Sequence, residues 1–117
     1  MKKLTKEEEK QIEKQKEYLR DVLLMHVGKG NEITSKEVAK LLGLDEDDTC
    51  SGTRALIKAC AYEYHIPLAA NMNGYFVIEN ADEMREYCQN LDFRASEILR
   101  RKEVIEGFYR EREAEHE

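Results

Sequence analysis

The order of patterns within residues 34–80 constrains the fold more than any other feature of the sequence. Two segments with the apolar spacing of helices come first, and Pro67, the only proline, ends the second because its ring blocks the continuation of a helix. Two short extended segments follow, joined by a turn that contains Asn73 and Gly74. An Asn-Gly pair is the strongest short-range signal of a β-hairpin, because both residues tolerate positive φ. The expected order is therefore helix, turn, helix, strand, tight turn and strand.

Capping and apolar patterns predict the bounds of the two central helices. Thr34 and Glu37 have the spacing of a capping box, which predicts a first helix over residues 35–42. Its buried face is expected to consist of Val38, Leu41 and Leu42. The second helix is expected over residues 50–64. By helical periodicity its inward face consists of Leu56, Ile57, Cys60, Ala61 and Tyr64. Its opposite face would then expose Ser51, Arg54, Ala55, Lys58, Tyr62 and His65.

A long helix is expected before this block. Thr5 and Glu8 again have the spacing of a capping box, so the helix would begin near Thr5. Gly28 and Gly30 would end it, since glycine readily takes the left-handed conformation that closes helices. One apolar stripe is visible: Ile12, Leu19, Val22, Leu23, His26 and Val27. Only the second half of the helix is therefore expected to contribute to the core.

A second long helix is expected after the block. Asn80 and Glu83 predict its start, and the pattern continues over residues 81–112. Three of its apolar residues are spaced by seven: Leu91, Ile98 and Ile105. Arg101 and Lys102 interrupt this repeat, so the coiled-coil signal is weak. The tail that follows is acidic.

Together these elements predict an α+β fold, mainly α with a small β wing. Ile33 is expected to add a one-residue bridge to the hairpin. The arrangement is that of a winged helix-turn-helix with long N- and C-terminal helices, in which the second central helix can enter a DNA major groove. The expected organisation is an N-terminal helix over residues 1–27, a core over residues 28–80 and a C-terminal helix over residues 81–117, all within a single domain.

Composition limits the cellular setting. No apolar run approaches the roughly 20 residues that a membrane span needs, and residues 1–11 lack the apolar segment of a signal peptide. We therefore expect a cytoplasmic protein that does not bind a membrane. Cys50, Cys60 and Cys88 form no C-x-x-C pair, which favours three buried or half-buried thiols over disulfides or a zinc site.

The charge balance is unfavourable for binding to nucleic acid. The net charge is −6, whereas affinity for DNA comes largely from cations that displace counterions from the phosphates. Residues 1–27 carry 7 basic and 6 acidic groups, residues 28–80 carry 5 and 8, and residues 81–117 carry 7 and 11. An acidic chain can still bind DNA when its positive groups share one face.

Three segments carry a family resemblance. They are NEITSKEVAKLLGL, an Arg-bearing helix that ends in HIPLAA, and NMNGYFVIENADEMREYCQNLDFRASEILR. Over about residues 34–101 the chain resembles small winged-helix proteins of bacterial phages and prophages. The resemblance implies binding to double-stranded DNA, in phage DNA replication or transcriptional regulation, and it implies no catalytic activity.

The principal candidate contacts lie on the helix over residues 50–64. Arg54 and Lys58 would reach base edges or phosphates, since Arg is the commonest reader of guanine. Ser51 would bind a phosphate, and Tyr62 would pack along the backbone. The alternative is that these side chains form an ordinary solvated helix face.

Two further surfaces would steady the DNA backbone. Asn71 and Asn73 on the wing could contact the sugar–phosphate chain, although their positions are also explained as turn-forming residues. Ser35 and Lys36 begin the first central helix, where backbone amides can hold a phosphate. The alternative there is a capped helix with a solvated lysine.

Other functions have weaker support in the sequence. There is no Gly-rich phosphate loop, nucleophile elbow or H-E-x-x-H motif, so neither an enzyme nor a cofactor is expected. The acidic run over residues 45–48 lacks the EF-hand spacing, which favours a capping turn over a metal site. The main alternative is an adaptor or modulator that binds a phage or host protein through an acidic surface and amphipathic terminal helices. Those helices could also form a homodimer.

Overall fold

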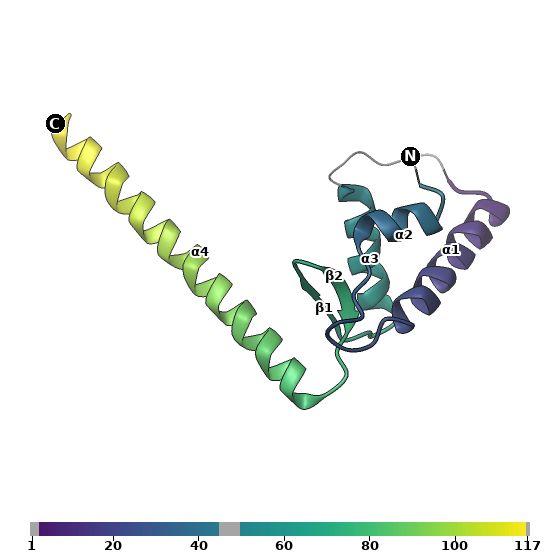
Figure 1. Cartoon of the computed structure of the whole chain (residues 1–117). Coiled ribbons are helices and arrows are strands. Elements are labelled where there is room, and N and C mark those ends of the chain that lie inside the picture. Colours follow the sequence, from purple (N-terminus) through teal and green to yellow (C-terminus); the bar gives the residue numbers. More distant parts are fainter. Residues whose placement is uncertain (1–2, 45–49, 117) are drawn as a thin grey trace. The chain divides into compact units, whose positions relative to one another are not determined.

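A computed structural model describes residues 3–44 and 50–116 of the chain (Figure 1). The chain is mostly helical with one small antiparallel sheet. The elements are α1 (Lys6–Leu24), α2 (Ser35–Leu41), α3 (Ser51–Glu63), β1 (Leu68–Asn71), β2 (Gly74–Val77) and α4 (Ala81–Glu115). They form two compact units, Met1–Glu83 and Met84–Glu117. The acidic run over residues 45–48, predicted to be a capping turn, lies outside the described residues.

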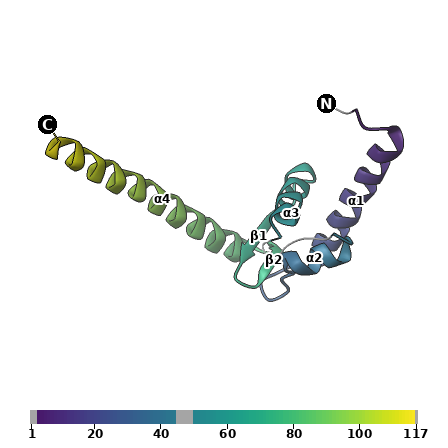
Figure 2. The same ribbon diagram turned by 90° about the horizontal axis from the view of Figure 1, so that it is seen from above.

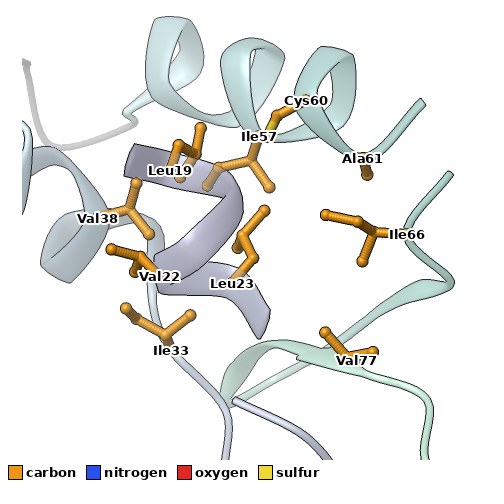
Figure 3. Close-up of a cluster of buried hydrophobic side chains, with 10 residues drawn as sticks. All are labelled: Leu19, Val22, Leu23, Ile33, Val38, Ile57, Cys60, Ala61, Ile66 and Val77. Carbon is orange, nitrogen blue, oxygen red and sulfur yellow. The ribbon is translucent and has the colours of Figure 1, made fainter. Parts of the chain in front are cut away.

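The core of the first unit joins its three helices to the hairpin (Figure 3). Its residues are Leu19, Val22, Leu23, Ile33, Val38, Ile57, Cys60, Ala61, Ile66 and Val77. The predicted inward residues Leu56, Tyr64 and Leu42 pack only partly against it. Ala39 is buried on α2, whereas Leu41, predicted to be buried, is 51% exposed. The short α2 therefore presents a different edge to α3 than its apolar pattern suggests, because tertiary packing decides which side is covered.

The end of α1 differs from the prediction. The helix ends at Leu24, and Val27 forms a parallel β-bridge with Val77. The amide of Val77 donates to the carbonyl of His26 at 2.8 Å, and the amide of Gly28 donates to the carbonyl of Val77 at 2.9 Å. Pairing with β2 therefore replaces the last predicted helical turn. The start is as predicted, since the Thr5 hydroxyl caps α1.

The predicted hairpin forms, with a different turn geometry from the one expected. Asn71 lies opposite Gly74 across a two-residue loop. Gly74 has a φ of +129°, but Asn73 is not at positive φ. Instead, the amide of Asn73 donates to the side-chain oxygen of Asn71 at 2.8 Å, which forms an Asx turn. The Asn-Gly pair thus indicated the correct reversal, but only its glycine uses the left-handed region.

Ile33 joins the hairpin as predicted. Its amide and carbonyl both bond to Tyr75, at 2.8 Å each. Next to this bridge, a Cβ atom on Gly74 would collide with the carbonyl of Ile33. Thr34 follows at once and caps α2 through a complete capping box with Glu37. The hairpin and the start of α2 are therefore fixed to each other.

The C-terminal helix is continuous in both views of the chain (Figures 1 and 2). Asn80 caps it, because its side-chain oxygen accepts from the amide of Glu83 at 2.9 Å. The helix extends to Glu115, beyond the predicted end at residue 112. None of the residues of α4 is buried, so its predicted apolar stripe remains on the surface. No helix within the described residues is both long and apolar enough to span a membrane.

Candidate nucleic-acid interface

The helix α3 has one side in the core and the other in solvent. Ile57, Cys60 and Ala61 are buried, as the periodicity predicts, and Thr53 is also buried, which the apolar pattern alone did not reveal. The opposite side is exposed over its whole length. We call the exposed residues Ser51, Arg54, Lys58 and Tyr62 the α3 face. The buried side fixes the rotation of the helix and so fixes which residues this face presents.

The α3 face carries two cations at successive turns of the helix. Arg54 and Lys58 are four residues apart, and neither forms an ion pair with another described residue. The ammonium group of Lys58 lies 5.7 Å from the ring centre of Tyr62, a cation–π contact that orients both side chains. The face therefore offers a guanidinium, an ammonium and an aromatic ring in a row.

The nearest acidic residue of α3 has its own partner. Glu63 forms an ion pair with Lys16 of α1, with 3.2 Å between the carboxylate and ammonium groups. This pair lies on the surface, where such contacts add little to stability. Its relevance is electrostatic, because it partly neutralises the one carboxylate that α3 contains.

The hairpin gives weaker support to DNA contact. The side-chain amide of Asn71 donates to the carboxylate of Glu32 at 3.0 Å, and its oxygen holds the turn amide of Asn73. This hydrogen bond from Asn71, with one from the amide of Gly30, lowers the pKa of Glu32. Asn71 thus has structural partners and an acidic neighbour. Asn73 is exposed, and the hairpin over residues 68–78 contains no Lys or Arg.

The start of α2 is already occupied by the chain itself. Glu37 and Thr34 form the capping box, with the Glu37 carboxylate accepting from the Thr34 amide at 3.2 Å. Ser35 is half-buried, whereas Lys36 is exposed. The Glu37 carboxylate also places a negative charge at this end of the helix, which is unfavourable for binding a phosphate there. Lys36 remains available for an electrostatic contact.

The eight predicted contact residues thus fall on three elements. Four of them share the α3 face, and the other four lie at the hairpin turn and at the start of α2. Sequence reasoning missed Met72, which is fully exposed in the hairpin loop beside Asn73. The sequence signal for this exposure is the position of Met72 in the two-residue loop of the hairpin, where side chains usually face solvent. The α3 face is the one surface where the predicted residues form a continuous row.

The structure also locates the potential metal-ligating side chains and the cysteines. No group of three or more His, Cys, Asp or Glu side chains in residues 3–44 and 50–116 could hold a metal ion. The prediction of three buried or half-buried thiols is correct for Cys50 and Cys60 and wrong for Cys88, which is exposed because no residue of α4 is buried. Burial raises the pKa of the Cys60 thiol, and its sulfur lies 3.7 Å from the carbonyl of Lys16. A raised pKa disfavours the reactive thiolate.

Comparison with known proteins found no matching family model, no similar curated protein and no similar solved structure.

Proposed function

We propose that the chain is a winged helix-turn-helix protein that binds double-stranded DNA without catalysing a reaction. In this proposal α3 is the recognition helix and the hairpin is the wing. The observation that carries it is the α3 face, where Arg54 and Lys58 are exposed, unpaired among the described residues and fixed outward by a buried opposite side. Phage replication or transcriptional regulation is the setting that the sequence resemblance implies.

Each residue of the α3 face would have a separate role on DNA. The forked guanidinium of Arg54 matches the two acceptors of guanine in the major groove. The ammonium of Lys58, held beside the Tyr62 ring, would contact a phosphate as a point charge. Ser51, in the first turn of α3, would donate its hydroxyl to a phosphate. Lys36 would add a weaker backbone contact.

The test is the binding of the full chain to a labelled duplex of mixed sequence, across a range of salt concentrations. Binding should weaken steeply as salt increases, because phosphate contacts release counterions. Arg54→Ala should cost about 1–3 kcal/mol if Arg54 reads a base, and Lys58→Ala should reduce the salt slope by about 1. Lys10→Ala is the matched control, because it removes one exposed cation from α1.

Two results would overturn the proposal. If the chain is folded by circular dichroism but does not retard duplex DNA at low salt, the DNA-binding function is wrong. Equal losses for Lys10→Ala and Arg54→Ala would also contradict it, because general charge and not the α3 face would then determine affinity. Either result would favour the adaptor function, in which the chain binds a protein.

A further inference from the structure

The apolar stripe of α4 has the spacing of a coiled-coil seam. Eight positions alternate in steps of four and three residues: Met84, Cys88, Leu91, Ala95, Ile98, Lys102, Ile105 and Tyr109. We call these eight residues the α4 seam. Seven of them are apolar or aromatic, and all eight belong to the second unit. Each step of four with the following step of three spans seven residues, and a repeat of 3.5 residues is the period at which two helices supercoil around each other.

Within the described residues of the second unit, the side chains of the seam are exposed. Met84, Leu91, Ile98, Ile105 and Tyr109 are 41–63% exposed. No residue of α4 is buried, although the helix runs from Ala81 to Glu115. Exposed large side chains that occur singly are ordinary, but a row along seven turns of one helix face indicates an interaction surface.

We propose that the α4 seam binds the α4 seam of a second copy of this chain, as a parallel two-stranded coiled coil. The d positions are Met84, Leu91, Ile98 and Ile105, and the a positions are Cys88, Ala95, Lys102 and Tyr109. In a parallel pair of identical helices, each seam side chain packs beside the same residue of the other helix, so the spacing of the seam matches that of a second copy. The proposal does not depend on DNA binding.

Lys102 indicates two strands and not more. A single polar residue at an a position lowers stability, but it can select the oligomeric state of a coiled coil. In a two-stranded coiled coil the long side chain of Lys102 can extend so that its ammonium group stays in solvent, whereas a coiled coil of three or more strands would bury that group. Its ammonium already lies 3.9 Å from the Glu106 carboxylate at the edge of the seam.

The flanking charges indicate the parallel orientation. In a parallel pair, position g of one helix faces the e position five residues later in the other, which places Arg101 opposite Glu106. In an antiparallel pair with the same seam layers aligned, Arg94 of one helix would meet Arg101 of the other twice, and the two favourable pairs of Arg85 with Glu106 would only offset this repulsion. Exposed ion pairs contribute little energy. The seam therefore supplies the association, and the charges select its orientation.

The first experiment compares two substitutions on opposite sides of α4. Ile98, at the centre of the seam, is 62% exposed, and Phe93, on the outer side, is 67% exposed. The wild type at micromolar concentration should sediment with twice the 13.7 kDa mass of one chain. Ile98→Glu should halve the mass, whereas Phe93→Glu should leave it unchanged. Circular dichroism checks that both variants keep the folded first unit.

The second experiment tests the orientation. In the parallel coil, Cys88 of one chain lies beside Cys88 of the other, whereas in the antiparallel coil it lies opposite Ile105. An aerobic copper–phenanthroline oxidant, which removes two electrons and two protons from a pair of thiols, should therefore produce a disulfide-linked dimer. Cys88→Ser should abolish this product, since Cys50 and Cys60 are buried.

Three outcomes would overturn parts of this inference. A wild type that is monomeric at all concentrations excludes the second copy as the occupant. A dimer that persists in Ile98→Glu, or is lost in Phe93→Glu, excludes the seam. A dimer that does not cross-link through Cys88 excludes the parallel orientation. None of these results bears on DNA binding by the α3 face, so the two proposals can fail separately.

Discussion

The helices α3 and α4 differ in what holds them in place. Of the 13 residues of α3, Thr53, Ile57, Cys60 and Ala61 are buried, whereas none of the 35 residues of α4 is. The core therefore fixes α3 and determines which side chains it exposes. Helix propensity and the Asn80 cap specify α4, and its apolar side remains open. The comparison shows two different kinds of exposed face: on α3 the face is polar and its rotation is set by the buried opposite side, and on α4 the face is apolar and none of its residues is buried.

The largest expected difference is in stability. Ile57→Ala should lower the free energy of unfolding by about 2–5 kcal/mol, because it removes a fully buried side chain from the core. Phe93→Ala should change it by no more than about 0.5 kcal/mol, because Phe93 is exposed on the side of α4 away from the seam. Urea denaturation of both variants measures the difference. A large loss for Phe93→Ala would show that α4 is packed after all.

Two glycines should respond in opposite directions. Gly74→Ala should destabilise the first unit by more than about 1 kcal/mol, because its φ is positive and the new Cβ would collide with the carbonyl of Ile33. Gly107→Ala should stabilise α4 by about 0.5–1 kcal/mol, since nothing lies within 4 Å of the added Cβ. Thermal unfolding followed by circular dichroism measures both changes. If Gly107→Ala lowers helicity, the interior of α4 is not an ordinary helix at that residue.

The smallest expected effect is a dependence on pH at the start of α4. The carboxylate of Glu83 accepts from the amides of Glu79 at 2.8 Å and Lys29 at 3.0 Å, and these bonds lower its pKa below the usual value of 4.5. A lowered pKa in the folded state gives stability that is present at neutral pH and is lost as the pH falls through that pKa. Glu83→Gln should therefore reduce the loss of stability measured by urea denaturation from neutral pH to about pH 3. Glu97→Gln, at an exposed site of α4, is the control for net charge, and equal profiles for the two variants would contradict the assignment.

Local sequence signals were sufficient for most element boundaries. The starts of α1, α2 and α4 follow from side-chain caps at Thr5, Thr34 and Asn80, because a cap involves residues only three positions apart. The hairpin follows from its turn residues in the same way. The end of α1 did not follow, because Val27 pairs with Val77, a residue fifty positions later. Long-range pairing of this kind leaves no local pattern.

For the candidate site too, local patterns were predictable from the sequence and long-range contacts were not. Helical periodicity alone placed Arg54 and Lys58 on an exposed face, and the structure agrees. The Asn71 contact could not be anticipated, because its partner Glu32 lies 39 residues earlier in the chain. The burial of Thr53 was missed for a related reason, since a polar residue gives no apolar signal.

The bridge between Ile33 and Tyr75 has a consequence for recognition. It joins the hairpin to Ile33, the residue before the Thr34 cap, so the same pair of hydrogen bonds holds the hairpin next to the start of α2. A ligand that touched both elements would meet a surface that is already assembled, and little conformational entropy would be lost in ordering it. A ligand that bound on this side of the molecule would therefore meet a preorganised surface, with little backbone rearrangement on binding.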